Sequence, residues 1–351
     1  MAKSINIGDF SVSDSGPVFI IAELSANHGG KLDLAKESIR AIKKSGADAV
    51  KVQTYHPDSM TLDSDKEIFM TRKDSLWAGR KLYDLYREGA LPYEWHPELK
   101  STAEDLGLIF FSTPFDIEAV DFLEQLNVPA YKVASLEITD IPLIIHIAKK
   151  GRPVLISTGI AEIEDIRLAV DACMKQGNDQ IILLKCTSSY PTPPEDANLK
   201  NMVWMREEFN FMTGLSDHTT DILAPVAAVT LGARVIEKHF ILDKSIKGLD
   251  AAFSLDAPAF TDMVNAIRIT EKLLGNQAYT MTEKMKTARI SSRSVIVTGD
   301  IRKGEFLTRD NIKVLRPGYG LHPKYYDDLI GKKANRDLTP GTPLSWEDIT
   351  S

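Results

Sequence analysis

Eight short apolar segments alternate with segments of helical periodicity along most of this 351-residue chain. The helical segments that we expect cover residues 34–45, 95–106, 116–126, 140–149, 162–175, 199–209, 221–231 and 258–275. Such alternation is typical of repeated β-α units, which build a parallel sheet. We therefore predict an α/β fold, a (β/α)8 TIM barrel, over residues 1–275.

Polar residues stand at the ends of nearly all the expected strands. In chain order they are Glu23, Lys51, Gln53, Thr113, Lys132, Ser135, Ser157, Ser188, Tyr190, His218 and His239. The carboxyl ends of barrel strands converge on one opening, where barrel enzymes place their active sites. We expect these side chains to meet in a single cleft.

The charge balance limits the partners of the chain. Lys and Arg number 42 against 49 Asp and Glu, and the net charge is −7. An acidic chain without long basic blocks is not expected to bind nucleic acid or an anionic membrane. The start, MAKSINIGDF, has no apolar signal segment, and no later stretch approaches the ~18 apolar residues of a membrane span. We expect a cytoplasmic protein.

The two cysteines, Cys173 and Cys186, lack the spacing of a disulfide framework or of a cysteine zinc site. Free cysteine usually behaves as a small apolar side chain. We therefore expect Cys186 to pack in a strand rather than to act as a nucleophile.

The segment 54–94 is too long for an ordinary β-α connection, and long loops at this edge of a barrel are usually functional. Within it, SLWAGRKLYDLYREG predicts an amphipathic helix with Leu82, Leu85 and Tyr86 on one face. Packing alone would also produce this pattern, so both interpretations stay open.

After Gly275 the pattern changes. Residues 276–290 are polar and predict a linker, and the rest of the chain contains an internal repeat. DIRKGEFLTRDNI, residues 300–312, corresponds to DLTPGTPLSWEDI, residues 337–349, at an offset of 37 residues. Each copy places a Gly in a turn before a Leu-Thr or Leu-Ser pair. We predict a β-rich domain over residues 291–351 that is too small to stand without support from the barrel or a partner chain.

Lys51 and Lys132 stand in apolar surroundings, AVKVQT and AYKVAS. Barrel strands are covered on both sides, so two lysines there indicate an anionic ligand. The same rim carries the hydroxyl donors Thr113, Ser135, Ser157 and Ser188, which suit a phosphate or carboxylate cradle. The alternative is that the lysines form internal ion pairs with Glu23, Glu137 or Glu237.

His218 and His239 follow two strands that should be neighbours, although they lack an HExxH-type spacing. Two imidazoles completed by water and substrate oxygens would suit a labile divalent cation that acts as a Lewis acid. The alternative is a pair of core histidines that donate hydrogen bonds to backbone carbonyls.

Nine motifs occur in a fixed order over nearly the whole chain: IAELSANHGG, KVQTY, FSTPFD, YKVASLE, LISTGI, LLKCTSSYPTP, GLSDHT, EKHF and VLRPGYG. In order and spacing they resemble the sialic acid (nonulosonate) synthase family. Within that family, WAGRKLYDLYREG, EWH, YKVASLE and CTSSYP are similar to the pseudaminic acid synthase branch. The N-acetylneuraminate branch typically carries Asn at the place of Ser188 and Gly at that of Leu136.

The resemblance implies a condensation of phosphoenolpyruvate with an amino-sugar aldehyde by C–O cleavage. Carbon 3 of the enol attacks the aldehyde, water adds at carbon 2, and phosphate leaves. For this branch the acceptor would be 2,4-diacetamido-2,4,6-trideoxy-L-altrose.

The resemblance also implies roles for individual residues. Phosphoenolpyruvate would be bound by Lys51, Thr113, Lys132, Ser135, Ser157 and Ser188. A divalent cation, Mn, Mg or Co, would be bound by His218 and His239, which with Glu23 at the attacking water form the catalytic set. The sugar would contact Gln53, Glu137, Tyr190 and Asp250, the last in a mobile loop.

The C-terminal segment resembles the antifreeze-like (SAF) domain of these synthases. The resemblance implies a domain-swapped homodimer in which Arg316 reaches over the cleft of the partner chain. Two alternative functions stay open: an N-acetylneuraminate or legionaminate synthase that takes a mannosamine-type sugar, and a phosphate- or sugar-binding barrel without turnover. A binding module has no need of the histidine pair, which favours an enzyme.

Overall fold

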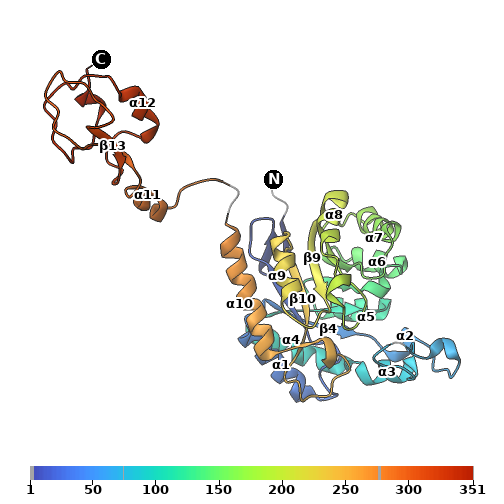
Figure 1. The fold of residues 1–351 in the computed structure, drawn as a ribbon. Coiled ribbons are helices and arrows are strands. Elements are labelled where there is room, and N and C mark those ends of the chain that lie inside the picture. The colour runs from blue at the N-terminus through green and yellow to red at the C-terminus, as the bar shows by residue number, and fades with distance from the viewer. Residues whose placement is uncertain (1–3, 74, 276–277, 351) are drawn as a thin grey trace. The chain divides into compact units, whose positions relative to one another are not determined.

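The computed structural model describes residues 4–73, 75–275 and 278–350, and the chain divides into two compact units, Met1–Gly275 and Asn276–Ser351. In the first unit eight parallel strands close a barrel in sequence order, because the last strand pairs with the first (Figure 1). They are β3 (Phe19–Glu23), β4 (Ala49–Thr54), β5 (Ile109–Pro114), β6 (Tyr131–Val133), β7 (Val154–Ser157), β8 (Ile181–Lys185), β9 (Met212–Asp217) and β10 (Val235–Ile241). The predicted (β/α)8 barrel is confirmed.

Every helix expected from periodicity is present, with ends that differ by at most two residues. They are α1 (Leu32–Lys44), α4 (His96–Asp105), α5 (Ile117–Gln125), α6 (Ile141–Ala148), α7 (Ile163–Lys175), α8 (Lys200–Phe209), α9 (Leu223–Thr230) and α10 (Ala257–Leu274). Asp116, Asp140 and Asp256 fix the starts of α5, α6 and α10, because each carboxylate accepts a hydrogen bond from a free backbone N–H of the first turn.

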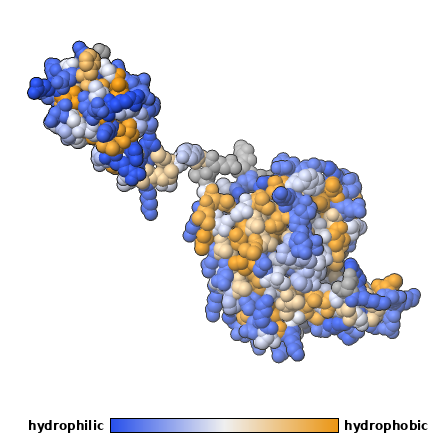
Figure 2. Space-filling view, viewed as in Figure 1, coloured by the Kyte–Doolittle hydropathy of each residue, from blue (hydrophilic) through white to orange (hydrophobic). Residues whose placement is uncertain are grey.

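The strands are buried almost throughout, since helices cover their outer faces and side chains fill the barrel. Every residue of β3, β8, β9 and β10 is buried. None of the helices in the described ranges combines the length and the apolar character needed to cross a membrane. Figure 2 shows hydrophilic colour over much of the visible surface, with hydrophobic patches among it on the barrel unit.

An antiparallel hairpin, β1 (Ser4–Ile7) and β2 (Phe10–Ser13), precedes the barrel and was not predicted from the sequence. Ile7 and Val12 are buried in the same apolar cluster as Phe19. Because Phe19 is the first residue of β3, the hairpin packs at the end of the barrel opposite the carboxyl ends of the strands. Its strands of four residues are too short to give a clear alternation in sequence.

Between β4 and β5 the chain leaves the barrel and forms an arm, residues 55–94, which projects beside the labels α2 and α3 in Figure 1. The arm contains α2 (Pro57–Met60), the 3-10 turn η1 (Glu67–Phe69), α3 (Leu82–Gly89) and the start of η2 (Tyr93–Trp95). The predicted amphipathic helix with Leu82, Leu85 and Tyr86 is therefore present as α3.

The C-terminal unit has a small sheet of two antiparallel strands, β12 (Ser294–Val297) and β13 (Ile312–Leu315). It also holds α12 (Tyr326–Leu329) and the 3-10 turns η6 (Pro323–Tyr325) and η7 (Trp346–Asp348). A short helix, α11 (Glu283–Arg289), lies in the segment that we expected to be a linker.

The internal repeat of the C-terminal unit has a structural counterpart. Ile301 and Leu338, which are equivalent in the two copies, exchange both backbone hydrogen bonds with each other at 2.9 and 2.8 Å. Gly304 and Gly341 both adopt positive φ, as the predicted turns require. The apolar core of the unit uses further equivalent pairs, Leu307 with Leu344 and Ile312 with Ile349. The two copies therefore pack on each other as similar halves.

Candidate active site

A pocket of about 720 Å³ opens at the carboxyl ends of the barrel strands. It is lined by every site residue predicted from the sequence except Arg316, which lies in the C-terminal unit. The lining residues are Glu23, Lys51, Gln53, Thr113, Lys132, Ser135, Glu137, Ser157, Ser188, Tyr190, His218, His239 and Asp250. Closure of the barrel brings these separate segments together.

Four buried charged groups occupy the floor of this pocket. Lys51 Nζ lies 2.7 Å from Glu23 Oε2 and 3.6 Å from Glu237 Oε1. It also donates a hydrogen bond to Thr113 Oγ1 at 2.9 Å. Lys132 Nζ, in contrast, donates to the carbonyl of Val133 at 3.0 Å and has no ion-pair partner among the described residues. The internal ion pairs that we considered as an alternative therefore exist for Lys51 and not for Lys132.

Burial shifts the pKa values of two of these charged groups, Glu23 and Lys132. Burial raises the pKa of Glu23, and the ammonium of Lys51 offsets only part of the effect. Burial likewise lowers the pKa of Lys132, and the Glu237 carboxylate opposes that shift only in part. A bound anion would stabilise the charged form of Lys132 and supply the partner that the protein does not.

Three serine hydroxyls gather beside the lysines, from the 3-10 turn η3 (Ser135–Glu137), from β7 and from the loop after β8. Ser157 Oγ and Ser188 Oγ are buried and have no hydrogen-bond partner in the described chain. Buried hydroxyls are rarely left without a partner, so these two indicate a ligand that accepts hydrogen bonds. We term Ser135, Ser157 and Ser188, together with Lys51, Lys132 and Thr113, the cradle.

Gly159 completes the cradle and was missed by the sequence analysis. Its N–H donates to Ser135 Oγ at 3.0 Å. A Cβ at this position would collide with Ser188 Oγ and lie 2.7 Å from Ser135 Oγ. The glycine therefore lets the backbone approach the hydroxyls, a close approach that its place in the motif LISTGI did not reveal.

His218 and His239 lie together, with ring centroids 5.2 Å apart. His218 Nδ1 donates to the carbonyl of Thr187 at 3.1 Å. His239 Nδ1 lies 3.2 Å from Ser25 Oγ, whose own proton goes to the carboxylate of Asp250. In its neutral form each ring therefore carries its proton on Nδ1 and presents the lone pair of Nε2.

This pair fits a divalent cation with open positions. Burial lowers the pKa of His239 well below its usual value, which keeps the ring neutral as a ligand requires. No cluster of three or more His, Cys, Asp or Glu residues is placed to hold a metal in the described ranges. The remaining ligands of a cation here would be oxygens of water or substrate, as for a catalytic rather than a structural site.

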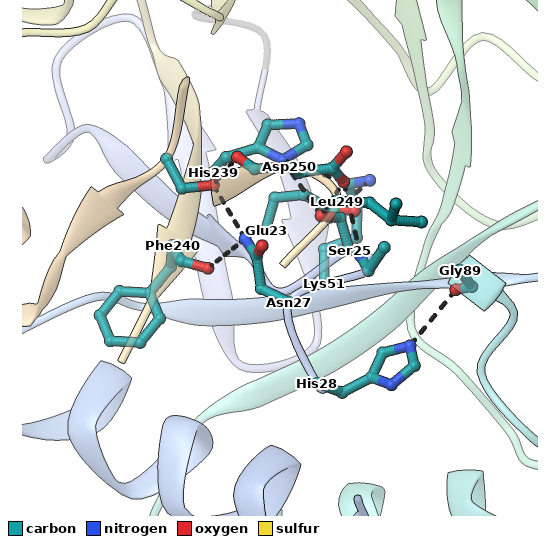
Figure 3. Close-up of polar contacts among 12 residues, drawn as sticks. Glu23, Ser25, Asn27, His28, Lys51, Gly89, His239, Phe240, Leu249 and Asp250 are labelled. Carbon is teal, nitrogen blue, oxygen red and sulfur yellow. Dashed lines mark hydrogen bonds and ion pairs between the residues drawn. The ribbon is translucent and has the colours of Figure 1, made fainter. Parts of the chain in front are cut away.

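The loop after β3 is fastened to the strand that carries His239 (Figure 3). Asn27 Nδ2 donates to the carbonyl of Phe240 at 2.9 Å and to Ser254 Oγ at 2.8 Å. The carboxylate of Asp250 accepts hydrogen bonds from Ser25 Oγ and, at 3.4 Å, from the N–H of Ala26. The Asp250 carboxylate is thus hydrogen-bonded to the loop after β3.

Cys186 also lines the pocket, which corrects the expectation that it packs within a strand. It follows the last residue of β8, and its Sγ lies 3.8 Å from His218 Nδ1. Burial raises the pKa of the thiol, but His218 together with Ser135 and Lys132 lowers it by more, to a net value of about 7. For His218 burial lowers the pKa, and Cys186 together with Thr187 and Asp217 raises it by more. Sequence spacing gave no sign of this contact, which depends on the pairing of β8 with β9.

The arm forms the outer wall of the pocket. Leu82, Leu85 and Tyr86 all line it, so the apolar face of α3 faces the site rather than packing only against the barrel. Trp77 Nε1 donates to the carbonyl of Leu249 at 3.2 Å, which ties the arm to the loop that bears Asp250. The sequence predicted the helix but could not show which surface it would cover.

The fold and the pocket define a barrel protein with a cationic, hydroxyl-rich cradle beside a pair of imidazoles. The chain belongs to the NeuB family, whose pattern it matches over residues 38–279, and residues 292–350 match the SAF domain. The predicted membership of the sialic acid synthase family is confirmed.

Relatives support this assignment along the whole chain. The pseudaminic acid synthase of Campylobacter jejuni is 49% identical over 98% of this chain and 100% of its own length. That of Helicobacter pylori is 48% identical over 95% of this chain and 98% of its own. The crystal structure of N-acetylneuraminic acid synthetase from Leptospira borgpetersenii in complex with citrate has a TM-score of 0.73 at 31% identity, and covers 82% of this chain and 95% of that one.

Proposed function

We propose that this protein catalyses the pseudaminic acid synthase reaction. It condenses phosphoenolpyruvate with 2,4-diacetamido-2,4,6-trideoxy-L-altrose and water, and it releases pseudaminic acid and phosphate. The observation that carries the proposal is one buried pocket in which the uncompensated ammonium of Lys132 and two unpartnered hydroxyls lie beside the histidine pair. The similarity to pseudaminic acid synthases over 98% of the chain supports the choice of sugar.

The cradle binds phosphoenolpyruvate. Lys51 and Lys132 neutralise its phosphate and carboxylate, and the hydroxyls of Thr113, Ser135, Ser157 and Ser188 donate hydrogen bonds to its oxygens. Binding at a fixed place orients carbon 3 of the enol toward the acceptor, which lowers the entropic part of the barrier.

The chemical steps balance without a further reactant. Carbon 3 forms a bond to the aldehyde carbon, and the electron pair of the C=O bond moves to the aldehyde oxygen. Water adds at carbon 2 and gives one proton to Glu23, whose Oε1 is buried and has no hydrogen-bond partner in the described chain. This proton then passes to the oxygen of the former aldehyde. The bond between carbon 2 and the phosphate oxygen breaks with its electron pair on that oxygen, the carbon-2 hydroxyl gives its proton to the phosphate and becomes the ketone, and phosphate leaves. Burial raises the pKa of Glu23, which suits a group that accepts a proton near neutral pH.

A divalent cation, Mn, Mg or Co, would be held by His218 and His239 and would supply Lewis acidity toward the aldehyde oxygen. The protein prepares this site by hydrogen bonds to both Nδ1 atoms, which set the tautomers. Gln53, Glu137, Tyr190 and Asp250 bind the sugar from the rim of the same pocket.

Two further proposals concern the assembly and the location. Arg316 of an exposed loop in the C-terminal unit completes the sugar site of a partner chain in a domain-swapped homodimer. This accounts for a unit whose apolar core is confined to a few side chains. The protein works in the cytoplasm, where phosphoenolpyruvate is made.

Phosphate release tests the proposed function. We expect release only when phosphoenolpyruvate and the diacetamido sugar are both present, and little release with N-acetylmannosamine. A chelator should stop the reaction, and added Mn²⁺ should restore it. His218→Ala should lower kcat by about 10²–10³, as for the loss of a group that stabilises transition-state charge. His146→Ala is the control, since His146 pairs with Asp121 at 2.8 Å outside the pocket lining. Preferred turnover of N-acetylmannosamine would instead identify the alternative synthase.

A further inference from the structure

The pocket has two halves of different chemistry. Its floor holds the cradle, whereas its outer wall is mainly apolar and comes largely from the arm. The apolar arm residues of this wall are Met60, Ile68, Met70, Leu76, Trp77, Leu82 and Leu85. Arg72 lines the pocket as well, as do Thr71 and Ser75, whose hydroxyls donate to carbonyls within the arm. Such a wall suits the C–H faces and apolar substituents of a sugar rather than its hydroxyl groups, which need hydrogen-bond partners when they are buried.

The arm is fixed against the sugar end of the pocket. The indole N–H of Trp77 donates to the carbonyl of Leu249, next to Asp250. The ring of Trp77 also lies 6.2 Å from that of Tyr190, centroid to centroid. The wall therefore faces the two residues that we assign to the acceptor, rather than the cradle of the donor.

Part of this wall has no apolar cover within the chain. Ile68 is 78% exposed and Leu76 is 49% exposed, although both line the pocket. Leu136 and Ile160 of the barrel also line the pocket, at 55% and 46% exposure. Exposed apolar side chains that line one pocket from both the arm and the barrel indicate a ligand with apolar groups.

We propose that the arm is a specificity element that selects an acceptor with apolar substituents at the end remote from the aldehyde. This inference rests on the proposed function, in which the aldehyde carbon must reach the donor at the floor. The opposite end of the sugar then reaches the arm. A deoxy carbon, which ends in a methyl group, and the methyl of an acetamido group both fit this wall. A hydroxyl at the same place would lose its hydrogen bonds to water without gaining a partner.

The test compares two acceptors that differ only at carbon 6. They are 2,4-diacetamido-2,4,6-trideoxy-L-altrose and its 6-hydroxylated counterpart, 2,4-diacetamido-2,4-dideoxy-L-altrose. We expect the wild-type protein to prefer the deoxy sugar in kcat/KM by about tenfold or more, the range by which an apolar pocket separates ligands of similar size. Ile68→Asn and Trp77→Ala should reduce the preference to less than about threefold, mainly through KM for the deoxy sugar. KM for phosphoenolpyruvate should not change.

Leu62→Asn is the matched control for Ile68→Asn. Leu62 is an apolar arm residue with 65% exposure that does not line the pocket, so its replacement should leave the preference unchanged. Because Ile68 is so exposed, its variant tests the wall even if Trp77→Ala fails to fold. A wild-type preference near one, or an unchanged preference in both wall variants, would overturn the inference. If neither acceptor yields phosphate with the wild-type protein, the proposed function itself is wrong.

Discussion

The mouth of the barrel and the C-terminal unit use burial for different purposes. The mouth buries Glu23, Lys51, Lys132 and Glu237, and several polar atoms there have no partner. The C-terminal unit buries a small aliphatic core, and none of its described residues, 278–350, has a buried polar side-chain atom without a partner. The barrel therefore buries charged and polar groups at an unfavourable free energy, at a place where a bound ligand can supply the missing partners. In the C-terminal unit Arg316 is exposed at the surface.

The largest expected effect is at the barrel mouth, where one substitution should lower activity without lowering stability. Lys132→Met should lower kcat/KM by about a hundredfold to a thousandfold, because the donor loses a cation that faces it. It should leave the melting temperature unchanged or higher, since no described carboxylate forms an ion pair with Lys132. Lys51→Met should lower activity similarly but cost about 3–5 kcal/mol of stability, because Glu23 loses its partner.

Steady-state kinetics and calorimetry on the three proteins check this contrast. Lys36→Met is the control: Lys36 pairs with Glu98 at 2.8 Å on the surface, so its loss should cost less than about 1 kcal/mol and leave turnover intact. Equal destabilisation by the two buried substitutions would show that Lys132 has a structural partner after all.

In the C-terminal unit, where the buried side chains are aliphatic, we expect a substitution in the core to lower stability. Leu307→Ala removes a fully buried side chain from the small core and should cost that unit about 2–5 kcal/mol. Calorimetry of the whole chain should show one transition lowered and the barrel transition unchanged. Leu315→Ala, at a position 41% exposed, should change neither. A shift of both transitions with Leu307→Ala would mean that the two units unfold together.

The smallest expected effect is a change of stability with pH at the barrel mouth. Burial raises the pKa of Glu137 to about 7, and Lys132 offsets only part of this shift. Because the folded-state pKa lies above the unfolded value of 4.5, the stability due to this group is complete below pH 4.5 and is lost as pH rises through 7.

The variant Glu137→Gln has no carboxyl group to ionise, so it should not lose this stability as pH rises. Its stability relative to the wild type should rise between pH 4.5 and pH 8, by at most about 3 kcal/mol. Urea unfolding of both proteins at several pH values measures the difference. A difference that does not vary with pH would show that Glu137 ionises normally and is reached by solvent.

The sequence predicted the features that depend on local pattern. Apolar runs ending in Lys51, Lys132 or His239 located the barrel strands, and the convergence of strand ends placed those side chains in one pocket. The contacts that the sequence did not reveal depend on distant segments. They include the approach of Gly159 to Ser135, the contact of Cys186 with His218 and the wall that the arm forms. The short β1–β2 hairpin was missed because four residues carry too little periodicity.

The seam between β3 and β10 joins the first and the last barrel strands, and their register sets His239 beside Glu23. On a ribosome Glu23 emerges early, while its neighbour across the seam is made only after the other seven strands. On the proposed mechanism, a nascent chain is therefore inert toward phosphoenolpyruvate until its ends meet. Turnover cannot begin before the last barrel strand is made, and a product truncated before β10 cannot consume the metabolite.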